Sequence, residues 1–107
     1  MTDSEFEELA DASLTALERS VEALDLDLDL QRKADGVLEL EFGDGSKIIV
    51  NRHAAAREIW VAAKSGGFHF RYDGGAWRDT RDGTELFAAL SRLVSAQSGS
   101  AVRLAPR

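Results

Sequence analysis

The chain has 107 residues, with 44% apolar and 30% charged side chains, 19 acids against 13 bases and a net charge of −6. This size and composition predict one soluble globular domain over residues 1–107. The absence of cysteine excludes disulfides, thiolate nucleophiles and cysteine-held zinc or iron–sulfur clusters. An acidic surface disfavours nucleic acid as a partner. Because no apolar run approaches the roughly 20 residues of a membrane span and no secretion signal is apparent, we expect a cytoplasmic protein without membrane contact.

The charges are distributed unevenly along the sequence. The first thirty residues contain ten carboxylates and one base, Arg19, which leaves nine acids and twelve bases for the rest. A chain with this asymmetry presents one strongly negative surface, which attracts cations and basic patches on other proteins. The function is therefore expected to depend on what this surface binds.

Residues 3–24 predict an amphipathic helix, because apolar side chains recur every three or four positions from Phe6 to Leu24. Asp3 or Ser4 is the expected N-cap. The opposite face of this helix carries an acidic stripe, which consists of Glu7, Asp11, Glu18 and Glu22.

Strict alternation of aspartate and leucine over residues 25–30 predicts a half-buried strand. The leucines would face the core and Asp25, Asp27 and Asp29 would face solvent. Aspartate is a poor strand former, and like charges on one strand face repel. Since this arrangement offers no structural gain, it indicates a functional surface.

Further strands are predicted by alternation and by glycine-containing turns, and a second helix follows them. The strands cover residues 37–42, 46–51, 58–63, 68–72 and 76–79, the helix covers 85–97 with Gly99 as its C-cap, and the tail through Leu104 is expected to fold back over the helices. This order predicts an α+β fold, a two-layer sandwich with the N- and C-terminal helices on one face of an antiparallel sheet. The other face of the sheet would then meet solvent.

Alternation places Trp60 on this open face, together with Lys47, Asn51, His69 and Arg71. An exposed tryptophan ringed by polar groups is typical of an interface hot spot. The alternative interpretation is a tryptophan half-covered by neighbouring long side chains.

The stretch NRHAAAREIWVAAKSGGFHFRYDGGAWRDTRDGTELF, residues 51–87, resembles the frataxin family. The segments MTDSEFEELAD and GVLELEFGDGSKIIVNR are similar to its bacterial branch in particular. The most specific matches are Asn51, Ile59-Trp60, Gly66-Gly67, His69-Phe70, Trp77, Gly83 and Leu86. The resemblance covers essentially the whole chain and implies the same two-layer fold.

The resemblance also implies a role in iron–sulfur cluster assembly, as a regulator rather than an enzyme. It implies weak iron binding through an acidic ridge, matched here by Glu18, Glu22, Asp25, Asp27 and Asp29, and we include Asp11 and Glu7 among the candidate metal ligands. It further implies binding to a cysteine desulfurase and an iron–sulfur scaffold protein. The residues matched to that interface are Asn51, Arg52 and Trp60, together with Glu18, Glu22 and Asp25.

Carboxylates are hard ligands, suited to ferrous and ferric iron and to other divalent cations. Glu18 and Glu22 lie one helical turn apart and could share an ion, but neither histidine nor cysteine is present in the stripe. We therefore expect weak, water-rich surface sites on a monomer that high iron can bridge into oligomers. Three alternatives stay open: a ferroxidase, an iron chaperone or donor, and an acidic adaptor of the desulfurase that acts independently of iron.

Overall fold

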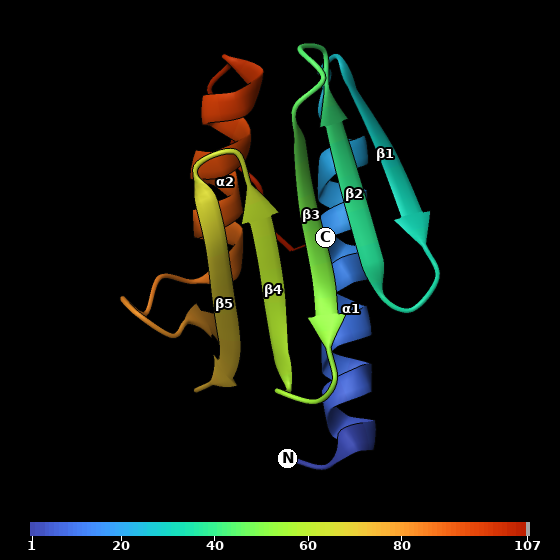
Figure 1. Ribbon diagram of the computed structural model, residues 1–107, viewed down its shortest axis with the longest axis vertical. Coiled ribbons are helices and arrows are strands. Elements are labelled where there is room, and N and C mark those ends of the chain that lie inside the picture. The colour runs from blue at the N-terminus through green and yellow to red at the C-terminus, as the bar shows by residue number, and fades with distance from the viewer. Residues whose placement is uncertain (107) are drawn as a thin grey trace.

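The computed structural model describes residues 1–106 and has two layers, with both helices behind one face of a six-stranded antiparallel sheet (Figure 1). Each strand pairs with the next in the sequence, so the sheet order is β1-β2-β3-β4-β5-β6. The elements are α1 (Asp3–Glu22), β1 (Leu28–Lys33), β2 (Val37–Phe42), β3 (Lys47–His53), β4 (Glu58–Ala63), β5 (Gly66–Asp73), β6 (Ala76–Asp79) and α2 (Leu86–Ser98). The predicted α+β two-layer sandwich is confirmed.

The N-cap of α1 is Thr2, so the expected caps Asp3 and Ser4 were wrong by one and two positions. Thr2 Oγ1 accepts a hydrogen bond from the Glu5 backbone N–H at 3.1 Å, and the Glu5 side chain accepts one from the Thr2 N–H at 3.2 Å. This reciprocal capping box satisfies two amides that have no partner within the helix. The backbone hydrogen bond from Thr2 is the main reason that the pKa of Glu5 is lowered.

Strand β1 begins at Leu28, three residues later than the aspartate–leucine alternation predicted. Leu28 pairs with Phe42, the last residue of β2, and the chain then turns through Gly43. Asp25 and Asp27 therefore have no strand residue opposite them, and they lie in the connection from α1. Only Asp29 of the three aspartates belongs to the strand.

The turn between β1 and β2 packs against Arg52 of β3 on the helix side of the sheet. In the three-residue loop that connects Lys33 to its strand partner Val37, Asp35 and Gly36 have positive φ angles of 63° and 72°, a conformation that glycine adopts readily. A Cβ atom on Gly36 would lie 2.8 Å from Arg52 Nε. The glycine thus allows the turn and also leaves space for the guanidinium of Arg52.

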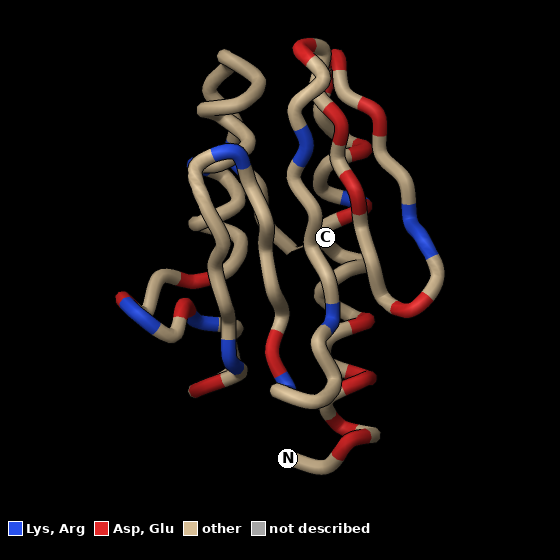
Figure 2. Tube along the Cα trace, viewed as in Figure 1, with Lys and Arg blue, Asp and Glu red and all other residues tan. Residues whose placement is uncertain are grey.

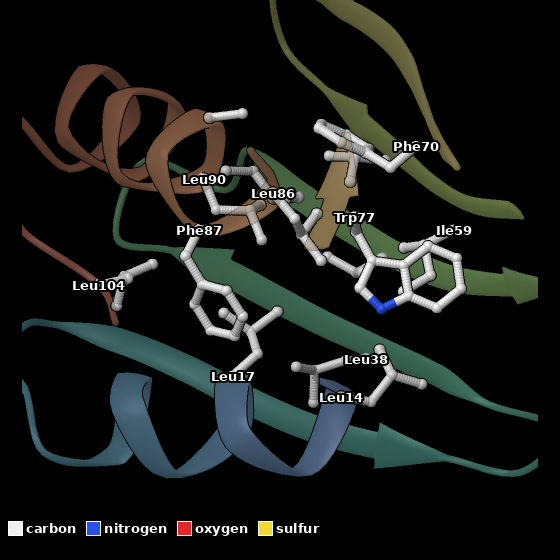
Figure 3. Packing of buried hydrophobic residues seen from close by; sticks show 14 of the residues in the cluster. Leu14, Leu17, Leu38, Ile59, Phe70, Trp77, Leu86, Phe87, Leu90 and Leu104 are labelled. Atoms are coloured by element: carbon white, nitrogen blue, oxygen red, sulfur yellow. The ribbon is translucent and has the colours of Figure 1, made fainter. Parts of the chain in front are cut away.

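The core fills the space between the sheet and the helices (Figure 3). Leu14 and Leu17 of α1 and Leu90 of α2 are each no more than 1% exposed. The core also includes Leu38, Ile59, Phe70, Trp77, Leu86, Phe87 and Leu104, of which the last lies in the C-terminal tail. The predicted return of the tail is confirmed, as is Gly99 as the left-handed C-cap of α2. Because all of this packing is on one side, the opposite face of the sheet stays open.

Candidate functional site

The acidic stripe of α1 is partly neutralised by bases of the sheet. Arg52 Nη1 lies 2.8 Å and 3.0 Å from the two carboxylate oxygens of Asp11. Arg32 Nη1 lies 3.2 Å from Glu18 Oε1. Glu22 is exposed at the last residue of the helix, and Glu7 lines a surface depression beside residues 54–57, at the far end of α1 from Glu22. The stripe is therefore not a continuous row of free carboxylates.

A second group of acids gathers where β1, β2 and the β2–β3 turn meet, at the top of Figure 2. We call it the acidic corner; it consists of Asp25, Asp27, Asp29, Glu41 and Asp44. Asp29 and Glu41 are direct cross-strand partners. Asp27, Asp29 and Glu41 line one shallow depression of about 230 Å³, and Asp25, Asp27 and Asp44 line an adjoining depression that reaches the end of α2. The corner therefore joins carboxylates from three segments.

Glu41 and Asp44 were not among the site residues inferred from the sequence. Alternation showed that Glu41 faces outward, but only the register of β1 against β2 places it opposite Asp29. Asp44 belonged to a predicted turn, and no local pattern connects it to Asp25. Its carboxylate accepts hydrogen bonds from the Ser46 side chain and backbone, which lower its pKa.

The acidic corner is suited to weak cation binding rather than to an enclosed metal site. Within residues 1–106, no three carboxylate or imidazole side chains come close enough together to hold a metal ion. Carboxylate oxygens still fit a hard cation chemically. The corner therefore offers negative potential and one or two oxygens at a time, with water completing the shell of any bound ion.

The open face of the sheet carries a stack of three aromatic rings. The Trp60 indole lies between His53, with ring centroids 3.6 Å apart, and His69, with centroids 4.4 Å apart, and the indole is within 10° of parallel to each imidazole. Trp60 is half-buried. The prediction of an exposed tryptophan is therefore corrected: it lies on the predicted face, but imidazoles cover both of its ring surfaces.

Glu58 fixes the edge of this stack. Trp60 Nε1 donates a hydrogen bond to Glu58 Oε1 at 2.9 Å, and Arg71 Nη2 donates one to Glu58 Oε2 at 2.7 Å. His69 Nδ1 lies 3.7 Å from the same carboxylate. Burial raises the pKa of Glu58, but the two hydrogen bonds and the positive charge of Arg71 together outweigh it and leave the pKa below its ordinary value.

Arg52 does not lie with Asn51 and Trp60, so its assignment to that surface was wrong. Along β3 the buried side chains are Ile48 and Val50, and Arg52 follows them on the helix side, where it binds Asp11. Asn51 lies on the open face directly opposite Trp60. Alternation between the two faces, rather than proximity in the sequence, separates these residues.

Two helices packed on one face of an antiparallel sheet are the fold of a frataxin-type protein. The frataxin-like domain matches residues 1–100 of the chain. The chain is 58% identical over 104 residues to the iron–sulfur cluster assembly protein CyaY of Dechloromonas aromatica, covering 97% of this chain and 99% of the relative. It is 52% identical over 106 residues to CyaY of Paraburkholderia phymatum, covering 99% and 100%.

Solved structures agree with this match. The frataxin of Psychromonas ingrahamii superimposes with a TM-score of 0.88 at 35% identity, covering 96% of this chain and 97% of that one. A trimeric yeast frataxin complexed with ferrous iron gives a TM-score of 0.68 at 28% identity, covering 90% and 87%. The chain therefore belongs to the frataxin family. Its relatives place it in the bacterial CyaY branch, as the sequence resemblance implied. In residues 1–106, no helix is both long enough and apolar enough to cross a membrane.

Proposed function

We propose that this protein regulates iron–sulfur cluster assembly by binding a cysteine desulfurase and its scaffold protein through two surfaces. One comprises the acidic corner together with Glu18 and Glu22 of α1, and the other is the open face around Asn51 and Trp60. The relatives named as iron–sulfur cluster assembly proteins support this role. The protein acts in this proposal by binding, not by catalysing a reaction.

The observation that carries the proposal is the set of carboxylates left without a base. Within residues 1–106, the ion pairs engage acids such as Asp11, Glu39 and Glu58, but no ion pair reaches a carboxylate of the acidic corner. A fold gains no stability from unpaired like charges, whereas a basic surface on a partner gains attraction from them. The corner is therefore suited to docking such a surface.

Iron is the cation that we assign to the same carboxylates. Asp25, Asp27, Asp29 and Glu41 would hold it weakly, and Glu22 would add a second position on α1 with Glu18, whose carboxylate already pairs with Arg32. Asp11 is held by Arg52 and would contribute mainly through its field, and Glu7 would do the same from its distant position on α1. Iron bound at the corner would cancel part of the charge that attracts the partner, which couples partner binding to iron.

The test is calorimetry of the protein with its purified cysteine desulfurase, anaerobically, with and without ferrous iron. The triple variant Asp25→Asn, Asp27→Asn, Asp29→Asn should bind more weakly and lose the iron effect. The matched control is Glu8→Gln, Asp35→Asn, Asp73→Asn, which changes the net charge equally at exposed positions elsewhere. Equal weakening by both triple variants would reduce the effect to net charge and contradict a specific docking corner.

A second candidate is an acidic adaptor that binds the desulfurase independently of iron. The observation that favours it is the lack of three clustered ligands within residues 1–106. Desulfurase affinity that ferrous iron leaves unchanged would select this candidate. The ferroxidase alternative requires oxidation of ferrous iron faster than in buffer, and slower again in the variant Glu18→Gln, Glu22→Gln.

A further inference from the structure

Glu58 is a nearly buried carboxylate on the open face of the sheet. Its side chain is 7% exposed, although it lies on the side that no helix covers. One oxygen accepts from the Trp60 indole and the other from the Arg71 guanidinium. The surrounding groups come from three strands: His53 from β3, Trp60 from β4, and His69 with Arg71 from β5. The carboxylate is therefore the centre of a polar cluster that contains the aromatic stack.

Stability alone is a weak reason for such a cluster. Removing a carboxylate from water is costly, and an apolar side chain of similar volume in place of a buried ion pair is often as stable or more so. With an apolar residue at position 58, the indole of Trp60 would no longer be held in a fixed orientation. The hydrogen bond fixes the Nε1 edge of Trp60, and the two imidazoles fix the plane of its ring.

This geometry limits how a partner can contact Trp60. Both ring surfaces are stacked and the N–H is already donated, so the remaining indole edge is what the tryptophan offers. A side chain already held in its bound orientation loses less conformational entropy on binding. The stack therefore provides a preformed contact surface, and the orientation of Trp60 within it depends on Glu58.

We infer that Glu58 is a positioning residue for partner binding, which holds the Trp60 indole edge and Arg71 in place without itself forming the contact surface. The inference rests on the proposed desulfurase interface. It adds a residue whose importance arises from its two hydrogen bonds inside the protein. A tryptophan released from Glu58 can turn, and binding then has to restore its orientation.

The main variant is Glu58→Leu, which fills a similar volume without an acceptor, and the conservative variant is Glu58→Gln, whose amide oxygen can still accept from the indole. The matched control is Glu39→Gln. Glu39 is another open-face carboxylate held by two cations, Lys33 and Lys47, but it lies away from the stack. Each protein is measured for desulfurase affinity by calorimetry, for the indole N–H resonance of Trp60 by NMR, and for thermal stability.

We expect Glu58→Leu to bind the desulfurase about tenfold more weakly, which is a typical loss for a displaced anchor side chain, and to shift the Trp60 indole resonance. Glu58→Gln should recover most of the affinity and a resonance close to that of the wild type. Glu39→Gln should change neither. If Glu58→Leu does not fold, Glu58→Ala replaces it in the same comparison.

Wild-type affinity in Glu58→Leu would overturn the inference and leave the proposed function intact. Equal losses in Glu58→Leu and Glu58→Gln, with an unmoved indole resonance, would also overturn it, because they would assign the effect to a direct charge contact. A wild-type protein that does not bind the desulfurase would overturn the proposed function and the inference together.

Discussion

Replacing Asp29 with asparagine should stabilise the protein. Asp29 on β1 and Glu41 on β2 are direct cross-strand partners on the open face, and both are exposed. Neither belongs to an ion pair within residues 1–106. Like charges in this relation destabilise a sheet. The substitution Asp29→Asn would keep the size of the side chain and remove the repulsion.

The magnitude follows from the geometry of the pair. Directly opposed residues have Cβ atoms about 5 Å apart, so we place the carboxylate charges at about 5.5 Å. In water this separation gives a repulsion of about 0.75 kcal/mol. Screening at physiological salt, with a Debye length of about 8 Å, reduces it to about 0.4 kcal/mol. For a domain of this size, the corresponding rise in melting temperature is about 2 °C.

Thermal unfolding followed by circular dichroism at about 0.15 M and about 1 M salt measures this effect. The stabilisation by Asp29→Asn should shrink at high salt, because the Debye length falls to about 3 Å. Asp73→Asn, at an exposed position at the end of β5, is the control and should change little. A destabilised Asp29→Asn protein, or a gain that salt leaves unchanged, would refute the electrostatic reasoning. The same variant should bind the desulfurase more weakly if the corner is a docking surface.

Three further outcomes are expected. Arg52→Ala should lower the free energy of unfolding by about 1 kcal/mol, because it breaks the partly buried ion pair with Asp11. A double-mutant cycle with Asp11→Asn, measured by urea unfolding, should isolate the energy of this pair. Strictly additive losses in the two single variants would contradict the prediction. Glu58→Gln should lose less stability in acid than the wild type. A carboxylate with a lowered pKa stabilises the fold at pH values above its ordinary pKa of 4.5 and loses that contribution as the pH falls. Urea unfolding between about pH 3 and pH 7 measures this, and an equal fall in the free energy of unfolding for both proteins would argue against it. Leu104→Ala should cost about 2–3 kcal/mol, because Leu104 is only 4% exposed against the helices, and an unchanged urea midpoint would show that the tail does not contribute to the core.

Local periodicity was sufficient to predict the layers of the fold and the face on which most side chains lie. The helical stripe from Phe6 to Val21 is buried as expected, and Trp60 lies on the open face. The Thr2 cap was also readable in principle, since a threonine three residues before a glutamate is the signature of a capping box. Such features depend on neighbours within one turn or one strand, which the sequence displays directly.

Features that depend on pairing between distant segments could not be predicted. The start of β1 is set by where β2 ends, at Phe42, although the aspartate–leucine alternation continues upstream of Leu28. The same register brings Glu41 into the acidic corner. Arg52 shows a different failure, because the strand was predicted to end at Asn51 and the family resemblance grouped Arg52 with Asn51 and Trp60. Strand β3 continues to His53, and this extension places Arg52 on the helix side, beside Asp11.

The carboxylates of the two candidate surfaces differ in burial and in pairing, and this difference constrains the partner. Glu58 is paired and nearly buried, so its charge is satisfied within the protein and it fixes the shape of the aromatic stack. The carboxylates of the acidic corner are exposed and unpaired within residues 1–106, so their charge is available to another molecule. A partner that uses both must therefore place basic groups at the corner and a complementary shape over Trp60. Raising the salt concentration should slow association through the corner, while changes at Glu58 should act mainly on the rate of dissociation.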